Sequence, residues 1–237
     1  YWRDWSSDVC SSDLRTSGPV VVRSMQDFEK EYGTYGADYT LHQHVRTFFE
    51  EGGVRAVVQR IVGGDAEVGA VNLQDADSDT CITLTAANAG DWSGDVSATV
   101  TVDGGEFSIS ITLDGVEVLS GTGLTSPAEA ITLVNNSIPH LLVATPGASD
   151  NNPDNQTEPL TAGDDDLAGL GDSDFVTALD SFGEDYGTGA VAAPEKYGST
   201  IWNGLKSHAV EYRRVAICAF DPDATASQAI SSASAYG

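Results

Sequence analysis

From residue 20 onward, short apolar runs alternate with amphipathic stretches. The run Val20 to Val22 predicts a short buried strand. Ser24 is placed to cap a helix over Met25 to Tyr32, with Asp27 at its third position. Gly33 is placed to end that helix. The chain therefore opens with a strand that leads directly into a capped helix.

A second helix and a second strand follow. Over residues 41–51 the apolar side chains fall at i, i+4, i+7 and i+8, which is one stripe of a helix. Asp38 is a candidate N-cap, and the pair Gly52-Gly53 supplies the left-handed residue that ends helices. Residues 54–62 then predict a strand. The order strand, helix, helix, strand indicates an α/β crossover. The stripe consists of Leu41, Val45, Phe48 and Phe49.

Between residues 65 and 145 the pattern changes to an alternation of apolar and polar residues. The alternating runs are separated by Asp103-Gly104-Gly105 and by Asp114-Gly115, which predict hairpin turns. Ser126-Pro127-Ala128-Glu129 forms a capping box for one short helix. We interpret residues 65–145 as a β-rich inserted domain.

Residues 146–171 are rich in Asp, Asn, Gly and Pro and almost free of large apolar residues, which predicts an acidic loop or linker. Residues 172–237 return to helix, strand, helix, strand, with strands at 190–193 and, buried, at 215–220. Residues 15–64 and 172–237 are expected to form the two halves of one core. The predicted fold class is α/β: a mostly parallel sheet with helices on its faces, interrupted by the β-rich inserted domain.

Residues 1–14 show no usable periodicity, and we set them apart as a non-native or disordered segment. One back-translation of residues 4–14, DWSSDVCSSDL, is a common sequencing-library adapter. We hypothesise that this stretch is translated adapter and exclude it, with Cys10, from the fold. Cys81 and Cys218 stand in no metal-ligand spacing and are expected to be buried thiols.

The chain carries 36 acidic and 11 basic residues, a net charge of −25. Such a surface repels phosphate backbones, so we expect no direct nucleic-acid binding. A soluble acidic surface is one explanation. A salt-rich host is another, because the Debye length at molar salt is only about 3 Å. No apolar run approaches the ~18 residues of a membrane span, so we expect no membrane insertion.

Motifs for catalysis or metal binding are few. The phosphate-loop and dinucleotide fingerprints are absent. Asp75, Asp77 and Asp79 begin like a calcium loop. However, Thr80 replaces its turn glycine and Ala86 its bidentate glutamate, which favours solvated turns. The sequence predicts no catalytic residue, no metal and no cofactor.

Two histidines and one aspartate are further candidates for a functional site. His42 and His44 point to different faces of a helix and cannot easily share a metal. The strongest enzymatic clue is Asp221, at the end of a predicted parallel strand, where α/β enzymes place ligand contacts. An α/β enzyme with a site near Asp221 and Pro194 therefore stays open, and it predicts a concave pocket there.

An ordered set of short motifs spans residues 18–237. A strand leads into S-x-x-[DE]-F-x-x-x-[FY]-G. A helix ending F-F-x-x-G-G, an arginine and a strand ending R-[IV]-V follow, and later come A-A-P and a segment close to R-V-A-I-x-x-x-D-x-P. This set resembles the contractile tail sheath proteins of bacteriophages and phage-tail-like particles, with Pro222 directly after Asp221 as a departure. The positions that we single out are Phe28, Gly33, Phe48, Phe49, Gly52, Gly53, Arg55, Arg60, Pro194, Arg214 and Asp221.

The resemblance implies a mechanical function. Copies of the chain would assemble helically around an inner tail tube and contract to drive the tube through a cell envelope, with genome ejection as the result in a phage. The implied partners are further copies of the chain, the tail tube protein, and the baseplate and tail terminator proteins. The implied location is a virion tail or phage-tail-like particle, assembled in the host cytoplasm.

Two further expectations accompany the resemblance. Sheath proteins continue into a C-terminal domain and use terminal arms, so the sequence is expected to be a fragment truncated at both ends. A surface or adhesion protein that binds a partner through the β-rich domain is the remaining alternative to a sheath protein or an enzyme.

Overall fold

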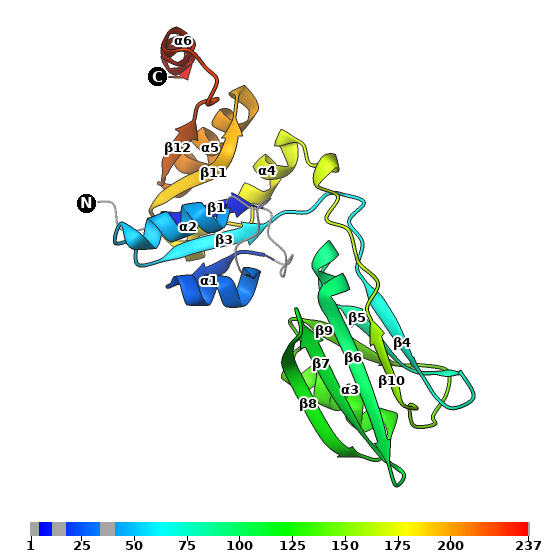
Figure 1. The fold of residues 1–237 in the computed structure, drawn as a ribbon. Coiled ribbons are helices and arrows are strands. Elements are labelled where there is room, and N and C mark those ends of the chain that lie inside the picture. The colour runs from blue at the N-terminus through cyan, green and yellow to red at the C-terminus, as the bar shows by residue number, and fades with distance from the viewer. Residues whose placement is uncertain (1–4, 11–17, 34–40, 237) are drawn as a thin grey trace. The chain divides into compact units, whose positions relative to one another are not determined.

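The computed structural model describes residues 5–10, 18–33 and 41–236 (Figure 1). The candidate cap Asp38 lies outside these residues. The chain separates into two compact units. The α/β unit contains the described residues up to Ile61 and those from Leu170 onward, and the β-rich unit contains residues 62–169. In chain order, the β-rich unit is therefore an insertion within the α/β unit.

A five-stranded sheet forms the centre of the α/β unit, in the order β12-β11-β1-β3-β2. β1 runs parallel to β11 and to β3, β11 runs parallel to β12, and β2 pairs antiparallel with β3. The two halves of the α/β core therefore meet in one sheet. Its strands are β1 (Trp5–Cys10), β2 (Val20–Val22), β3 (Ala56–Arg60), β11 (Ala190–Tyr197) and β12 (Val215–Ala219).

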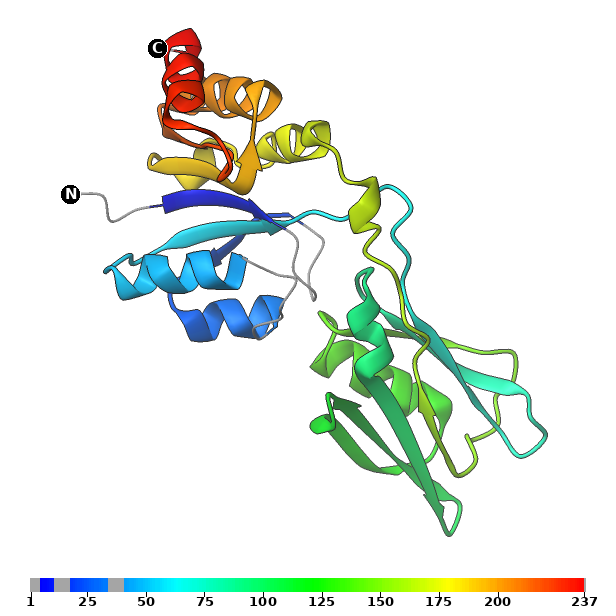
Figure 2. The ribbon, with the colours of Figure 1, turned by 45° about the horizontal axis from the view of Figure 1, so that its top comes forward.

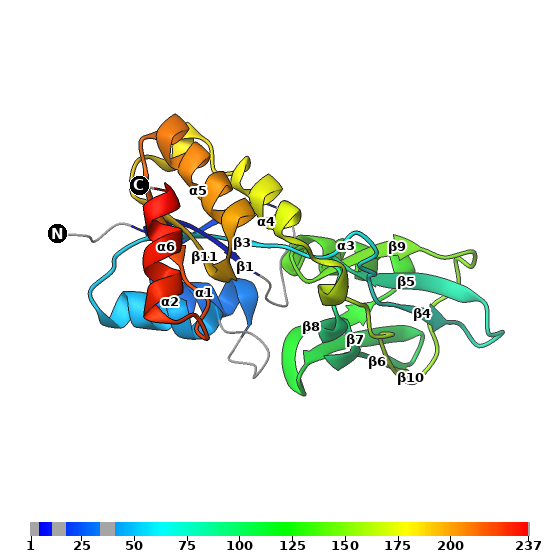
Figure 3. The ribbon, with the colours of Figure 1, turned by 90° about the horizontal axis from the view of Figure 1, so that it is seen from above.

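Helices cover both faces of this sheet (Figure 3). α1 and α2 pack on one face through a cluster that includes Phe28, Leu41 and Val58. α4 and α5 pack on the other face through a cluster that includes Val57 and Leu205. Neighbouring residues of β3 supply the two clusters because side chains alternate across a strand. The helices of this unit are α1 (Met25–Tyr32), α2 (Leu41–Glu50), α4 (Asp172–Leu179), the 3₁₀ turn η3 (Glu184–Tyr186), α5 (Ser199–Tyr212) and α6 (Ala226–Tyr236).

Capping residues set the bounds of α1 where the sequence predicts them. The Ser24 hydroxyl accepts a hydrogen bond from the backbone N–H of Asp27 at 3.0 Å, which satisfies one of the free N–H groups at the helix start. Gly33 follows the last turn with a φ of 86°. With its ψ of 175°, this conformation is essentially restricted to glycine. The predicted bounds of this helix are therefore confirmed.

Residues 5–10 form β1, which lies between β3 and β11 in the middle of the sheet. The structure differs here from the sequence interpretation, which treats residues 1–14 as non-native or disordered. The local pattern of residues 5–10 could not show this strand, because its backbone pairs with residues about 50 and 185 positions further along the chain. The adapter hypothesis concerns the gene and stays a prediction.

β12 is an edge strand, and its two faces differ. Ala216 and Cys218 pack against the cluster under α4 and α5. Val215 and Ile217 point to the other side of the sheet and are 44% and 38% exposed. The prediction of a buried strand over residues 215–220 is therefore wrong, because one face of β12 is exposed and the other is only partly buried.

Two antiparallel sheets and one helix make up the β-rich unit (Figure 2). One sheet has the order β4-β5-β9 and the other β10-β6-β7-β8. The backbone N–H of Asp154 donates to Gln74 at 2.9 Å and that of Thr161 to Ala70 at 3.0 Å, which joins the two sheets beside β4. The elements are β4 (Ala70–Gln74), β5 (Thr80–Ala86), the 3₁₀ turn η1 (Asp91–Asp95), β6 (Val96–Asp103), β7 (Glu106–Leu113), β8 (Val116–Leu124), α3 (Pro127–Ser137), β9 (Leu142–Pro146), β10 (Gln156–Pro159) and the 3₁₀ turn η2 (Leu167–Gly169).

The alternating residues of β6 and β7 face one core, with the side chains of Val96, Phe107 and Ile109 almost fully buried. Both predicted hairpin turns are present. At the second turn, Asp114 and Gly115 have φ values of 52° and 74°. Two successive positive φ values are the requirement of the turn that suits the twist of two antiparallel strands.

Of residues 146–171, predicted as an acidic loop or linker, residues 146–169 are part of the β-rich unit. β10 pairs antiparallel with β6, and Leu160 is only 3% exposed. The N–H of Gly63 donates to Asp165 at 2.9 Å, so the segments by which the chain enters and leaves the unit run side by side. The composition concealed β10 because edge strands are commonly built from polar residues.

The mixed α/β class is confirmed. Among the strands described, six of nine pairings are antiparallel, so the mostly parallel arrangement is confined to the five-stranded sheet. None of the helices described is both long enough and apolar enough to cross a membrane.

Candidate functional site

The motif residues of α1 build a packed corner with α2 and β3. Phe28 is 1% exposed and stacks on Tyr32, with 5.1 Å between the ring centroids. The Tyr32 hydroxyl donates to the carbonyl oxygen of Val58 at 2.6 Å. His42 of α2 lies edge-on to Phe28 and its Nε2 is 3.0 Å from Glu29. His42 is therefore a buried structural residue at the edge of the core, as the lack of ligand spacing predicts.

The turn after α2 needs both of its glycines. Gly52 has a φ of 91°, and the N–H of Gly53 donates to the carbonyl oxygen of Phe48 at 2.8 Å. This is the bonding pattern of a glycine C-cap. A β-carbon on Gly53 would collide with the Phe48 ring, which itself packs edge-on against Phe49. In the F-F-x-x-G-G motif, the backbone of the second glycine therefore packs directly against the ring of the first phenylalanine.

Two motif arginines from distant parts of the sequence hold one loop, residues 182–187 between α4 and β11. Arg214 is 7% exposed and donates three hydrogen bonds to carbonyl oxygens of this loop, while Arg55 donates a fourth. Hydrogen bonds from an ionised donor are roughly twice as strong as neutral ones, so the loop is firmly fixed. The acceptors are Phe182 (2.6 Å), Gly183 (2.7 Å) and Gly187 (3.0 Å) for Arg214, and Tyr186 (3.1 Å) for Arg55.

His208 of α5 completes this arrangement. Its Nε2 lies 2.6 Å from Nη1 of Arg214, and both side chains are buried. A guanidinium only donates, so Nε2 accepts and the neutral ring carries its proton on Nδ1. Burial and the positive charge of Arg214 lower the pKa of His208 to about 4. We call Arg55, Arg214, His208 and the loop 182–187 the arginine junction.

The remaining motif residues lie elsewhere. Arg60 ends β3 and is 2% exposed. Pro194 lies in β11 beside an irregularity at which Glu195 has a φ of 57°. Asp221 stands in the exposed turn after β12, where its carboxylate accepts the N–H of Asp223 at 2.9 Å. The motif set is therefore spread over the α/β unit and does not converge on one reactive centre.

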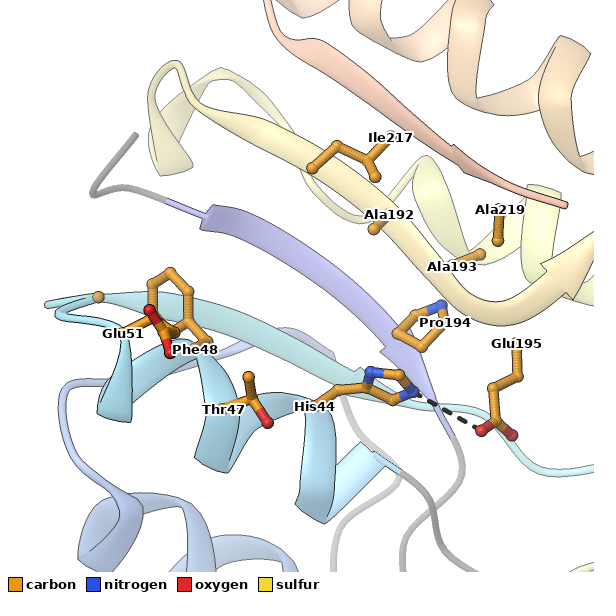
Figure 4. Close-up of a pocket in the computed structure, with 11 residues that line it drawn as sticks. His44, Thr47, Phe48, Glu51, Ala192, Ala193, Pro194, Glu195, Ile217 and Ala219 are labelled. Carbon is orange, nitrogen blue, oxygen red and sulfur yellow. Dashed lines mark ion pairs between the residues drawn. The ribbon is translucent and has the colours of Figure 1, made fainter. Parts of the chain in front are cut away.

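An apolar groove of about 350 Å³ lies between α2 and the strands β11 and β12 (Figure 4). We call it the α2–β12 groove. Near Pro194, His44 Nε2 is 3.7 Å from Glu195 Oε1, and both side chains are about half exposed. The enzymatic alternative predicts a pocket near Pro194 and Asp221, but Asp221 is not among the lining residues. These are His44, Thr47, Phe48, Glu51, Gly53, Ala192, Ala193, Pro194, Glu195, Ile217 and Ala219.

The aspartates that begin like a calcium loop form a closed turn. Asp75 Oδ1 accepts the N–H groups of Asp77 at 3.0 Å and Asp79 at 2.9 Å. Its Oδ2 accepts the Ser149 hydroxyl at 2.6 Å and the Asn151 amide at 3.0 Å. These hydrogen bonds lower the pKa of Asp75 to about 2. Within the described ranges, no group of three His, Cys, Asp or Glu side chains is arranged to hold a metal ion.

The two cysteines of the core differ in burial. Cys81 is buried and donates to the carbonyl oxygen of Leu73, while Cys218 is half-buried. Burial raises the pKa of both thiols. Both are therefore kept as neutral thiols near pH 7.

Sequence reasoning found no ligand spacing for His208 and favoured a surface or core-edge role, but it missed the contact with Arg214. His208 lies three positions after Leu205 and seven after Ile201, which places it on the apolar stripe of α5. That spacing could have shown that the side chain is buried. It could not have named Arg214 as the partner, because Arg214 lies beyond the end of the helix.

Comparison with known proteins finds similarity in structure only. No family profile matches the sequence, and no curated protein does. The sheath tail protein of Listeria innocua matches with a TM-score of 0.69 and 16% identity, over 90% of this chain and 45% of that chain. The sheath tail protein of Desulfitobacterium hafniense matches with a TM-score of 0.63 and 14% identity, over 88% of this chain and 46% of that chain.

These matches confirm, at the level of the fold, the resemblance carried by the motifs. The chain has the fold of solved sheath tail proteins and spans less than half of their length. The matched share of this chain is too large to come from the α/β unit alone, so the inserted β-rich unit is part of the likeness.

Proposed function

We propose that this protein is a structural subunit of a contractile tail sheath. Its copies assemble helically around an inner tail tube, and contraction of the assembly drives that tube through a cell envelope. Its partners are further copies of the chain, the tail tube protein, and the baseplate and tail terminator proteins. Its place is the tail of a virion or of a phage-tail-like particle.

One observation carries the proposal: the fold match to sheath tail proteins over 90% of this chain. A parallel sheet with helices on both faces serves many functions and would by itself say little. The match includes the β-rich insertion, which makes it more specific than a likeness of the α/β core.

The packing of the α/β unit suits a mechanical role. The arginine junction ties the starts of β3 and β12, together with α5, to the loop before β11, and the corner at Gly53 fixes the end of α2. A subunit that transmits force needs a core that moves as one body. Non-closing contacts between such bodies build helical tubes, and two packings of one assembly can store the energy for contraction.

An α/β enzyme that uses the α2–β12 groove is a second candidate. The observation that favours it is an apolar cavity with an imidazole and a carboxylate, His44 and Glu195, at one end. The groove offers no serine or cysteine among its lining residues, and Asp221 lies outside it. We therefore rank this candidate below the sheath subunit.

Negative-stain electron microscopy of the protein, expressed from its complete gene together with the tail tube protein, tests the proposal. Samples in low salt and in molar salt are compared, because the charge of −25 opposes assembly when it is not screened. Hollow tubes with a regular axial repeat are the expected result. Monomers in both conditions, with the tube template present, contradict it.

A further inference from the structure

Within the described part of the chain, the α2 side of β12 is an apolar surface that no element covers. Ile217 and Ala219 of β12 and the alanines of β11 form one wall of the α2–β12 groove, and Phe48 forms the other. Val215 and Ile217 remain 44% and 38% exposed. The opposite face of the same strand is covered by α5. The sheet therefore lacks one covering element at this edge.

Among the residues that the structure describes, none covers the apolar stripe of α6. Its start is well capped, since the N–H of Thr225 donates to Gln228 Oε1 at 2.8 Å and the Thr225 hydroxyl accepts the N–H of Gln228 at 3.3 Å. Its apolar residues fall at i, i+3, i+4 and i+7, yet Ile230 is 67% exposed. Figure 1 shows α6 beyond the β12 edge of the sheet. The stripe consists of Ala226, Ala229, Ile230 and Ala233.

The two surfaces match in length and in size. α6 has 11 residues and β12 has 5, so each is about 17 Å long at the rise per residue of its structure. The wall of the groove is rich in alanine, and α6 is built almost entirely of alanine and serine, so helix and sheet can approach closely. α6 carries no charged residue that the groove would have to desolvate.

The connection between β12 and α6 can act as a pivot. Phe220 packs edge-on against Trp202, with 5.1 Å between the ring centroids, and so anchors the end of β12. Asp221 accepts the N–H of Asp223 through its carboxylate and that of Ala224 through its carbonyl, each at 2.9 Å. The six residues 220–225 are a usual length for a strand-to-helix connection. A change at residues 221–225 therefore moves α6 and leaves β12 in place.

We propose that α6 is a strap that folds back over β12 and seats Ile230 in the α2–β12 groove, and that the structure shows this strap open. The occupant is the chain's own α6, because a connection of this length holds the helix at an effective concentration of roughly millimolar beside the groove. When the strap is closed it blocks the groove to any other ligand, and when it is open the groove is accessible. The inference does not depend on the proposed sheath function.

Disulfide trapping in the full-length protein tests the strap. Cys10, Cys81 and Cys218 are replaced by alanine, and cysteines are introduced by Ile217→Cys in the groove and Ile230→Cys on α6. Mild oxidation is expected to give an intramolecular disulfide whose yield does not depend on protein concentration. The matched control pairs Ile230→Cys with Val210→Cys, which is 76% exposed on α5 at the opposite face of the sheet, and is expected to give none.

Two results overturn the strap. Cross-links only between molecules, rising with protein concentration, assign the groove to α6 of a second copy. The other result is a variant that has the circular dichroism spectrum of the wild type but forms no disulfide between positions 217 and 230. That result shows that α6 stays open.

A second measurement leaves the native cysteines in place. Amide hydrogen exchange of residues 226–236 is expected to become about tenfold faster on Ile230→Asp and to stay unchanged on Ser231→Asp, which adds the same charge one position along the helix, on the face opposite the apolar stripe. Equal exchange in wild type and Ile230→Asp contradicts the strap.

Discussion

The two units hold buried charge in opposite ways. In the α/β unit a cation, Arg214, donates to the carbonyl oxygens of one loop and to a neutral imidazole. In the β-rich unit an anion, Asp75, accepts from two N–H groups, a hydroxyl and an amide. Each charge is solvated by uncharged groups of the protein, which is what makes burial tolerable.

The same division appears in the total charge. Residues 62–169 contain 18 acidic residues and no lysine or arginine, a net charge of −18. The rest of the chain contains 18 acidic and 11 basic residues, a net charge of −7, which completes the total of −25. The acidity of this protein is therefore chiefly a property of the insertion, while in the α/β unit Arg55 and Arg214 make structural hydrogen bonds.

Arg214→Met is expected to have the largest effect and to act on one unit only. The substitution leaves the carbonyl oxygens of the loop 182–187 without their donor and opens a polar site in the core. A buried acceptor left without its donor costs about 1–3 kcal/mol, and several are left here, so the expected loss is roughly 3–5 kcal/mol. Urea unfolding followed by hydrogen exchange of peptides from each unit should show the α/β unit destabilised and the β-rich unit unchanged.

Arg46→Met is the matched control for this prediction. Arg46 is also paired, with Glu50 at 2.9 Å, but its side chain is 62% exposed. Exposed pairs of this kind contribute less than about 1 kcal/mol. Equal losses in the two variants, or an equal loss in both units, would show that Arg214 has no special structural role.

Salt is expected to act mainly on the β-rich unit. Between about 0.01 and 1 M salt the Debye length falls from about 30 to 3 Å, which screens the repulsion among 18 like charges. The gain in unfolding free energy should be on the order of 2 kcal/mol for the β-rich unit and much smaller for the α/β unit. Sucrose, which favours burial without screening, is the control and should act on both units alike. A salt effect of equal size in both units would contradict this prediction.

Sequence patterns predicted the features whose hydrogen bonds span only a few residues. Ser24 and Gly33 set the bounds of α1, and Asp114-Gly115 makes its hairpin turn, because capping and turn chemistry are local. The convergence of Arg55 and Arg214 on one loop could not be predicted, since nothing in the local sequence of either arginine names the other.

Burial along the edges of the sheets was equally hidden from the sequence. Val215 and Ile217 look like core residues, but their exposure depends on whether another element covers β12. The converse holds for β10, whose polar residues indicate a loop although its backbone pairs with β6. In both cases the neighbouring element, and not the residue type, decides the environment.

Acid is expected to weaken the α/β unit through His208. Its pKa in the folded protein, about 4, lies below the ordinary 6.5, so the unfolded chain binds more protons between these values. Stability of the unit therefore falls as the pH drops from about 6.5 to 4, by on the order of 1–2 kcal/mol after partial solvent screening. In His208→Gln the amide oxygen can still accept from Arg214 but does not titrate, so this part of the pH dependence should vanish. Parallel pH profiles for the two proteins would exclude His208 as the cause.

The smallest effect is expected for Asp75, which acts both as a hydrogen-bond acceptor and as one of the like charges of the β-rich unit. Asp75→Asn removes an acceptor from Ser149 and Asn151, which destabilises the unit, but it also removes one of 18 like charges, which stabilises it. The second contribution disappears in molar salt, so the fall in the urea midpoint, a few tenths of molar at most, should be larger there than in dilute buffer.

Asp114→Asn is the control, because asparagine accepts the same φ of 52° at this exposed turn and only the charge is lost. Asp114→Asn should therefore raise the midpoint slightly in dilute buffer and leave it unchanged in molar salt. If the urea midpoints of the two variants fall by equal amounts and respond to salt alike, the hydrogen bonds of Asp75 do not distinguish it from a surface charge.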